Sequence, residues 1–188
     1  MNDIERTAEI SECGLYRWTL GRRWAAGPSV CFVMLNPSTA DGERDDPTIR
    51  RCMAFAKAWG FSALSVRNLF PYRATDPKQM GKASLAGVDI TGGERGTSEL
   101  RAASAADLVV AAWGANHLWT FGAFKFFYVT EPTPIYCINT TQRGHPVHPL
   151  YQKLTTRPAP YMRCDEFAQV EENRGVGDKT EKTAAQDR

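Results

Sequence analysis

Four short, mainly apolar runs are spaced along the chain, at residues 30–35, 63–69, 108–113 and 134–139. Each has the length of a strand and is followed by polar or turn-forming residues. Runs of this kind are typical of strands that are buried on both faces of a parallel sheet. The pattern therefore predicts a core of four strands, separated by segments that are long enough to form helices.

The segments between these strands have the features of helices. Asp46 followed by Pro47 predicts a helix start, because aspartate caps free backbone N–H groups and proline suits the first helical position. Gly60 predicts the end of this helix. Two further helices are expected at residues 97–106 and 117–129. The apolar positions that give the first helix a buried face are Ile49, Cys52, Met53, Ala56 and Trp59.

Helical crossovers connect strands that run in the same direction. We therefore expect an α/β fold, a three-layer α/β/α sandwich with a central, mainly parallel four-stranded sheet in the order 2-1-3-4, numbered along the chain. Residues 16–24 have an extended pattern. We expect them to form an N-terminal antiparallel edge strand that pairs with the first core strand across a turn at Gly27 and Pro28.

The chain has 188 residues, of which 43% are apolar and 23% are charged. This is enough to bury one sizeable core, so we expect a single domain over residues 1–164. Residues 165–188 contain seven acidic and four basic side chains and little to bury, which predicts a disordered tail. The rest of the chain has a net charge of +5, which is compatible with a nucleic-acid partner without requiring one.

Membrane and secreted classes are not indicated by the sequence. No apolar run approaches the length that crosses a membrane, and the amino terminus, with Asp3, Glu5 and Glu9, lacks the basic and apolar blocks of a signal peptide. We therefore expect a cytoplasmic protein with no membrane partner.

The cysteines show no metal-binding or redox spacing. There are five, and no Cys-x-x-Cys pair is present, so we expect neither a metal nor another cofactor. Cys31, Cys52 and Cys137 are expected to be reduced thiols in the core. Cys13 and Cys164 lie in less regular sequence, and a role as metal ligands is the weaker alternative for them.

Two polar signatures follow the first and the fourth predicted strand. Asn36-Pro37-Ser38-Thr39 comes after the first, and HPVHPLY at residues 145–151 comes after the fourth. The carboxyl ends of parallel strands meet at one edge of a sheet, where open α/β proteins bind their ligands. We therefore expect the two loops to close on one small molecule or one base.

The residues that leave the four strands, taken in order, resemble the motifs of the uracil-DNA glycosylase superfamily. The four matching segments are Asn36-Pro37, Asn68, Trp113-Gly114 and His148-Pro149. The resemblance covers residues 30–151. The chain also resembles a little-characterised bacterial and phage family organised around the segments MLNPSTAD, DDPTIRRC, NLFPYRATDP, AWG and GHPVHPLY. Leu35 and Leu150 depart from the superfamily pattern, which leaves the identity of the substrate open.

The resemblance implies catalytic roles for residues on the two loops. His148 would stabilise the negative charge that develops on the departing base, and Asn36 would orient the attacking water. An amide cannot accept a proton from that water. If the reaction needs a general base, Asp41 is preferred over Asp45 and Asp46, because Asp46 is expected to cap a helix. The alternative is that these side chains only form turns.

The substrate contacts that the resemblance implies lie on the same loops. Asn68 would read the edge of a pyrimidine with its amide. Phe70 and Tyr72 are near enough to stack on a flipped base, although packing in the core is the explanation that is slightly favoured for them. His145 offers a second register for the catalytic histidine. The remaining residues expected to bind substrate are Pro37 and Ser38.

Contacts to DNA are expected from five further side chains. Arg73, Lys78 and Arg143 would contact phosphates, although solvent exposure is the ordinary role of single cations. Leu150 and Tyr151 occupy the place of the intercalating loop of the superfamily and would hold the duplex open. Docking of this loop on the core is the alternative.

Together, these features predict a monomeric, metal-independent and monofunctional DNA glycosylase. It would flip out a damaged or modified pyrimidine, such as uracil or a hypermodified phage base, and leave an abasic site, in repair or in phage defence. No lysine lies near the motifs to form a Schiff base. The alternatives are a nucleic-acid-binding module without turnover, and a hydrolase or transferase that acts on free nucleotides or nucleosides.

Overall fold

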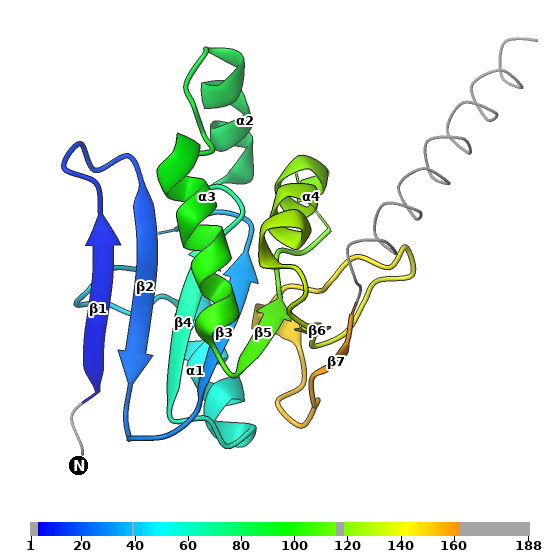
Figure 1. Cartoon of the computed structure of the whole chain (residues 1–188). Coiled ribbons are helices and arrows are strands. Elements are labelled where there is room, and N and C mark those ends of the chain that lie inside the picture. The colour runs from blue at the N-terminus through cyan, green and yellow to red at the C-terminus, as the bar shows by residue number, and fades with distance from the viewer. Residues whose placement is uncertain (1–3, 39, 116–118, 162–188) are drawn as a thin grey trace, which may run out of the picture.

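In the computed structural model, which describes residues 4–38, 40–115 and 119–161, one sheet of seven strands has helices on both faces (Figure 1). The strands are β1 (Glu5–Ile10), β2 (Arg17–Arg23), β3 (Ser29–Met34), β4 (Ala63–Asn68), β5 (Leu108–Ala111), β6 (Ile135–Cys137) and β7 (Ala159–Pro160). The helices are α1 (Pro47–Ala58), α2 (Pro77–Leu85), α3 (Gly93–Arg101) and α4 (Trp119–Thr130), with short 3-10 turns η1 (Ala102–Ala105) and η2 (Pro149–Tyr151).

The sheet is mixed, with the order β1-β2-β4-β3-β5-β6-β7 across the described residues. The pairs β4–β3, β3–β5 and β5–β6 are parallel, whereas β1–β2, β2–β4 and β6–β7 are antiparallel. The expected four core strands are therefore adjacent and parallel, in the expected order. The sheet is nevertheless larger than the four strands and one antiparallel edge strand that were expected, because two antiparallel strands extend one side and one extends the other.

The first extended segment does not take the place expected for it. β2 pairs with β4 rather than with β3, and β1 covers its other side, so β2 is not an edge strand. The reason is that β3 already has a parallel neighbour on each side, β4 and β5. The outer side of β4 was the pairing edge that remained for β2.

The helix signals are confirmed in part. The Asp46 carboxylate accepts a hydrogen bond from the Ile49 N–H at 2.8 Å, and Pro47 begins α1 as expected. The same signal at Asp76 begins α2, which was not predicted. The helix expected at 97–106 begins earlier, as α3, and continues into η1. The helix expected at 117–129 is α4, which occupies residues 119–130, and residues 117 and 118 lie outside the described residues.

The central strands are buried on both faces, as their continuous apolar sequence predicts. Cys31 and Val33 of β3 pack with α2, α3 and α4, whereas Val30 and Phe32 pack with α1 on the opposite face. Figure 1 shows α3 and α4 in front of the sheet and α1 behind it. None of the helices in the described part of the chain has the length and apolar character needed to cross a membrane.

The three cysteines expected in the core are buried there as free thiols. Burial raises the pKa of Cys31 and Cys52, and raises that of Cys137 to about 11. Cys13 is exposed. Cys164 and the expected tail at 165–188 lie outside the described residues.

Candidate active site

The carboxyl ends of β3, β4, β5 and β6 form one edge of the sheet, which we call the rim. Backbone hydrogen bonds continue past the strands, from Leu69 N to Met34 O and from Ala112 N to Val33 O, each 2.8 Å long. The chain leaves β3 towards β4 on one side and later enters β5 on the other side. The topological switch point therefore lies at the carboxyl ends of β3 and β5. Open α/β sheets bind their ligands at such a point.

Asn36 holds the loops after β3 and β4 together. Its Nδ2 donates to Ala74 O at 2.7 Å and to Pro37 O at 3.1 Å, and Ala74 N donates back to Pro37 O at 3.0 Å. The nitrogen of this amide is therefore used by the backbone. Among the described residues its oxygen accepts no hydrogen bond, so it can accept one from a water or a ligand.

Asn68, at the end of β4, is 6% exposed and lies against a buried arginine. Its Oδ1 accepts a hydrogen bond from Arg17 Nη2 at 3.4 Å. Its Nδ2 is buried and has no hydrogen-bond partner among the described residues. A buried donor without a partner costs about 1–3 kcal/mol, which an acceptor on a ligand would recover.

Arg17 is a site residue that the sequence reading missed. It is 3% exposed, and its Nη1 donates to Ala40 O at 2.8 Å. Burial lowers its pKa to about 10, while Asp46 and Asp41 act in the opposite direction. An arginine in an extended segment with alternating polar and apolar residues is usually on the solvated side, so the sequence offered no signal for its burial.

The charge of Arg17 lacks the partner that a buried arginine usually has. Among the described residues, no carboxylate oxygen lies within 4.0 Å of its guanidinium. Arg22 on the same strand, by contrast, donates from Nε to Asp45 Oδ1 at 2.7 Å. Burying an unpaired charge costs several kcal/mol, so an anion arriving nearby is favoured.

His148 is the N-cap residue of η2. Its Nδ1 accepts a hydrogen bond from Leu150 N at 3.3 Å, which places the ring proton of the neutral imidazole on Nε2. Burial lowers the pKa of His148, with Asp46 opposing the shift. A Cβ atom added to Gly114 would be 3.7 Å from the His148 Cβ, so the imidazole lies beside the end of β5.

Asp46 lies close enough to both Arg17 and His148 to interact with them through its charge. Its negative charge acts on both Arg17 and His148, favouring their protonated forms. Its own carboxylate is held by the cap of α1, as expected. The rim cluster, as we use the term below, consists of Arg17, Asn36, Asp46, Asn68 and His148.

Two predicted site residues have other roles in the structure. The Asp41 Oδ1 accepts hydrogen bonds from Glu43 N and Arg44 N, both 2.8 Å long, and these bonds lower the pKa of the carboxyl. This turn role was the alternative for Asp41, and a lowered pKa makes it a weak base. Phe70 is 4% exposed and packs in the core against α4, so stacking on a base is not supported.

The other aromatic and loop residues remain near the rim. Tyr72 is half-buried and packs edge to face on Tyr16, with 6.1 Å between ring centroids. Pro37 is buried, and Ser38 is half-buried. Trp113 is buried against α4, which fits the scaffold role expected for it.

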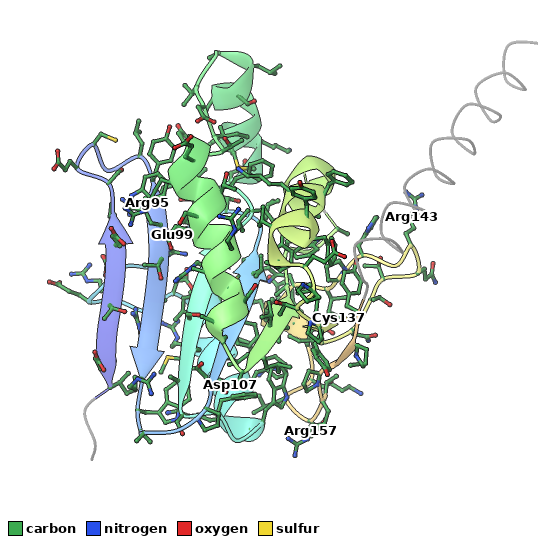
Figure 2. All side chains as sticks on the ribbon, viewed as in Figure 1. Arg95, Glu99, Asp107, Cys137, Arg143 and Arg157 are labelled. Carbon is green, nitrogen blue, oxygen red and sulfur yellow. The ribbon has the colours of Figure 1, made fainter. Side chains whose placement is uncertain are left out.

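The residues that were expected to contact DNA differ in their exposure and in their position. Arg73 is half-buried and donates from Nη1 to Gly14 O at 3.1 Å. Lys78 is exposed in the first turn of α2. Figure 2 shows Arg143 on the outward side of the loop that follows β6, away from the centre of the sheet. Beside His148, Leu150 is half-buried and Tyr151 is 86% exposed.

His145 lies in the loop that follows β6. Its backbone N–H donates to Thr141 Oγ1 at 3.2 Å within the loop after β6. This residue lines a hollow of about 400 Å³ together with Ala115, Thr141, Gln142 and Arg143. A second hollow, of about 440 Å³, lies at the opposite end of the sheet, near Asp107 in Figure 2, and contains no predicted site residue.

A family model with the description "Protein of unknown function (DUF1643)" matches residues 17–150. The chain belongs to the DUF1643 family. The region shared with the family begins at Arg17 and extends just past His148, so it contains the whole rim cluster. No match was found among curated proteins or among solved structures.

Proposed function

We propose that this protein is a monofunctional DNA glycosylase that removes a damaged or modified pyrimidine from DNA. The observation that carries the proposal is the set of hydrogen-bond donors at the rim. Among the described residues, Asn68 Nδ2 is a buried donor without a partner, and no carboxylate pairs with Arg17, which donates to Asn68 Oδ1. The bond from Leu150 N to His148 Nδ1 leaves the proton of the neutral imidazole on Nε2. Such a set suits a ligand that gains negative charge.

Hydrolysis of a glycosidic bond produces this charge. The bond between the base nitrogen and C1′ of the sugar breaks, and its electron pair moves onto the base. His148 Nε2–H donates a hydrogen bond to the carbonyl oxygen of the base, where the charge accumulates. The oxygen of a water, oriented by Asn36 Oδ1, bonds to C1′. The water releases one proton to solvent, and the base anion takes up one proton from solvent.

Asp41 does not act as a general base in this reaction. Its carboxylate is held by the two backbone N–H groups of its own turn. A sugar with developing positive charge is attacked by a weak nucleophile, so a positioned water is sufficient. Asp46 contributes a negative charge close to the rim. This charge would stabilise the positive charge that develops on the sugar.

Binding of DNA would use the surface beside His148. Tyr151 is largely exposed next to the catalytic loop and is suited to enter the space that a flipped base leaves. Arg73 supplies a cation close to Arg17. We keep the sequence-based proposals of a monomer in the cytoplasm and of a substrate that is uracil-like or a hypermodified phage base, in repair or phage defence.

The test uses the full chain and labelled oligonucleotides that contain uracil, mismatched thymine, or 5-substituted pyrimidines, as single strands and as duplexes. Excision is measured as alkali-labile sites and as free base by mass spectrometry. We expect excision from at least one substrate, with losses of about 100-fold or more in His148→Ala and Asn36→Ala. Gel shifts without excision would indicate a binding module instead. Hydrolysis of free nucleosides alone would indicate a nucleotide enzyme.

A further inference from the structure

We propose that Arg17 is a positioning residue that acts through Asn68. It fixes the Asn68 amide with its nitrogen towards the base and strengthens that donor as the base becomes an anion. This inference rests on the proposed glycosylase activity. It assigns a role to a buried side chain on β2, outside the motifs that suggested the function.

Arg17 determines the orientation of the Asn68 amide. The Asn68 Oδ1 accepts from Arg17 Nη2 at 3.4 Å. If the amide were reversed, its NH2 group would meet the guanidinium, and two donors would face each other without an acceptor. Arg17 therefore determines that the group presented to a ligand is Nδ2–H, which has no partner in the described part of the chain.

Arg17 is itself held in position by the backbone. Its backbone N–H donates to Pro71 O at 3.0 Å and its Nη1 donates to Ala40 O at 2.8 Å. These bonds tie it to the loops after β4 and β3. The guanidinium is thus held by both loops of the rim while it contacts Asn68.

The positive charge of Arg17 also affects Asn68. Arg17 is buried without a carboxylate partner among the described residues, so its positive charge is poorly compensated before reaction. A hydrogen bond to a cation polarises an amide and makes its N–H a stronger donor. Negative charge on the base is therefore stabilised more in the transition state than in the bound substrate, which is the condition for catalysis.

A purely structural role makes a different prediction. If Arg17 only connected the two loops, its loss would slow excision of every base by the same factor. If it acts on the developing anion, its loss has a larger effect on a poor leaving group than on a good one. Fluorine at C5 of a pyrimidine stabilises the anion, so 5-fluoro bases are the better leaving groups.

The kinetic test compares duplexes that contain uracil with 5-fluorouracil, and cytosine with 5-fluorocytosine, in single-turnover reactions. Arg17→Met should slow excision of the unsubstituted base about 100-fold and that of its fluorinated analogue about 10-fold. Asn68→Ala should show the same selectivity, and the double variant should be no worse than Asn68→Ala alone. Arg17→Lys, which keeps the charge, should recover part of the rate.

Arg22→Met is the matched control. It also removes a buried arginine from β2, but one that is paired with Asp45. It should leave the ratio between the two leaving groups as it is in the original protein. Equal slowing of both leaving groups by Arg17→Met, or additive effects in the double variant, would overturn the inference.

A second measurement does not depend on activity. In the ¹⁵N-labelled full chain, the Asn68 side-chain NH2 signals should be resolved and slow to exchange, and Arg17→Met should shift and broaden them. If the original protein excises none of the bases in the panel while this NMR effect is present, the proposed function fails and the pairing is retained. If the signals are unaffected by Arg17→Met, the positioning role is wrong.

Discussion

Arg22 Nε donates to Asp45 Oδ1 at 2.7 Å, and this pair joins β2 to the loop that follows β3. The same guanidinium donates to the carbonyl oxygens of Thr7 and Asp41. One side chain therefore connects the first two strands with the loop that carries Asn36.

Asp45→Asn should destabilise the protein by about 3 kcal/mol, because it leaves the buried cation of Arg22 without its carboxylate. Urea denaturation, followed by circular dichroism, measures the free energy of unfolding. Glu43→Gln, which changes an exposed carboxylate on the same loop, is the control and should leave the midpoint unchanged. An equal effect of both variants would show that the loop does not depend on the ion pair.

The stability of the protein should decrease as the pH falls through the ordinary titration range of His148. Burial lowers its pKa below the ordinary value of 6.5. The unfolded chain therefore takes up a proton at a higher pH than the folded chain, and unfolding is favoured below about 6.5. NMR titration of the imidazole should give a value under 6.5, and His148→Gln should remove this part of the pH dependence. A measured pKa above 6.5 would contradict the burial described for this ring.

Asp41→Asn should retain excision to within about threefold, because the variant keeps an oxygen that accepts from the backbone of its turn. Single-turnover rates measure this. Asp41→Ala, which removes the acceptor, serves as the comparison and should lower the excision rate more than Asp41→Asn does. A loss of about 100-fold in Asp41→Asn would restore Asp41 as the general base.

Gly122→Ala should destabilise the protein by about 1–3 kcal/mol, because α4 lies very close to the end of β4 at this position. An added Cβ would be 2.8 Å from the Leu69 Cβ and 3.1 Å from Cε2 of Phe70. Thermal unfolding measures the change. Phe124→Ala, on the exposed side of the same helix, is the control. Unchanged stability in Gly122→Ala would show that the helix can move outwards at no cost.

Tyr151→Ser should reduce excision from duplex DNA about tenfold while leaving excision from single strands unchanged, because only the duplex has a stack for the ring to enter. The ratio of the two rates is the measurement. Tyr128→Ser, at an exposed tyrosine on α4, is the matched control. If both ratios change equally, Tyr151 has no special place in binding duplex DNA.

The sequence predicted the parallel core well because its signals are local. The apolar run at residues 30–35 and the pair Asp46-Pro47 each specify one element without help from distant residues. The pairing of β2 with β4 was not predictable in this way, because it depends on which edge is free after the core has formed. β7, with two residues, is too short to give a pattern.

The candidate site was predictable only where polar residues follow a strand. Asn36, Asn68 and His148 have this position, and the structure places all three at the rim. Arg17 does not, since it begins a strand that runs the other way. Phe70 was misplaced because an aromatic side chain after a strand has the same sequence signal whether it faces the core or a ligand.

β2 runs against β4, so it starts at the edge where its parallel neighbours finish. This reversal places Arg17, at the start of β2, in the candidate site. The hairpin of β1 and β2 therefore contributes a residue to that site. A protein split within residues 24–28 would leave the guanidinium on one fragment and the imidazole on the other. Excision by the proposed glycosylase would then report reassembly of the two fragments, which makes this connection the natural place to build a split reporter.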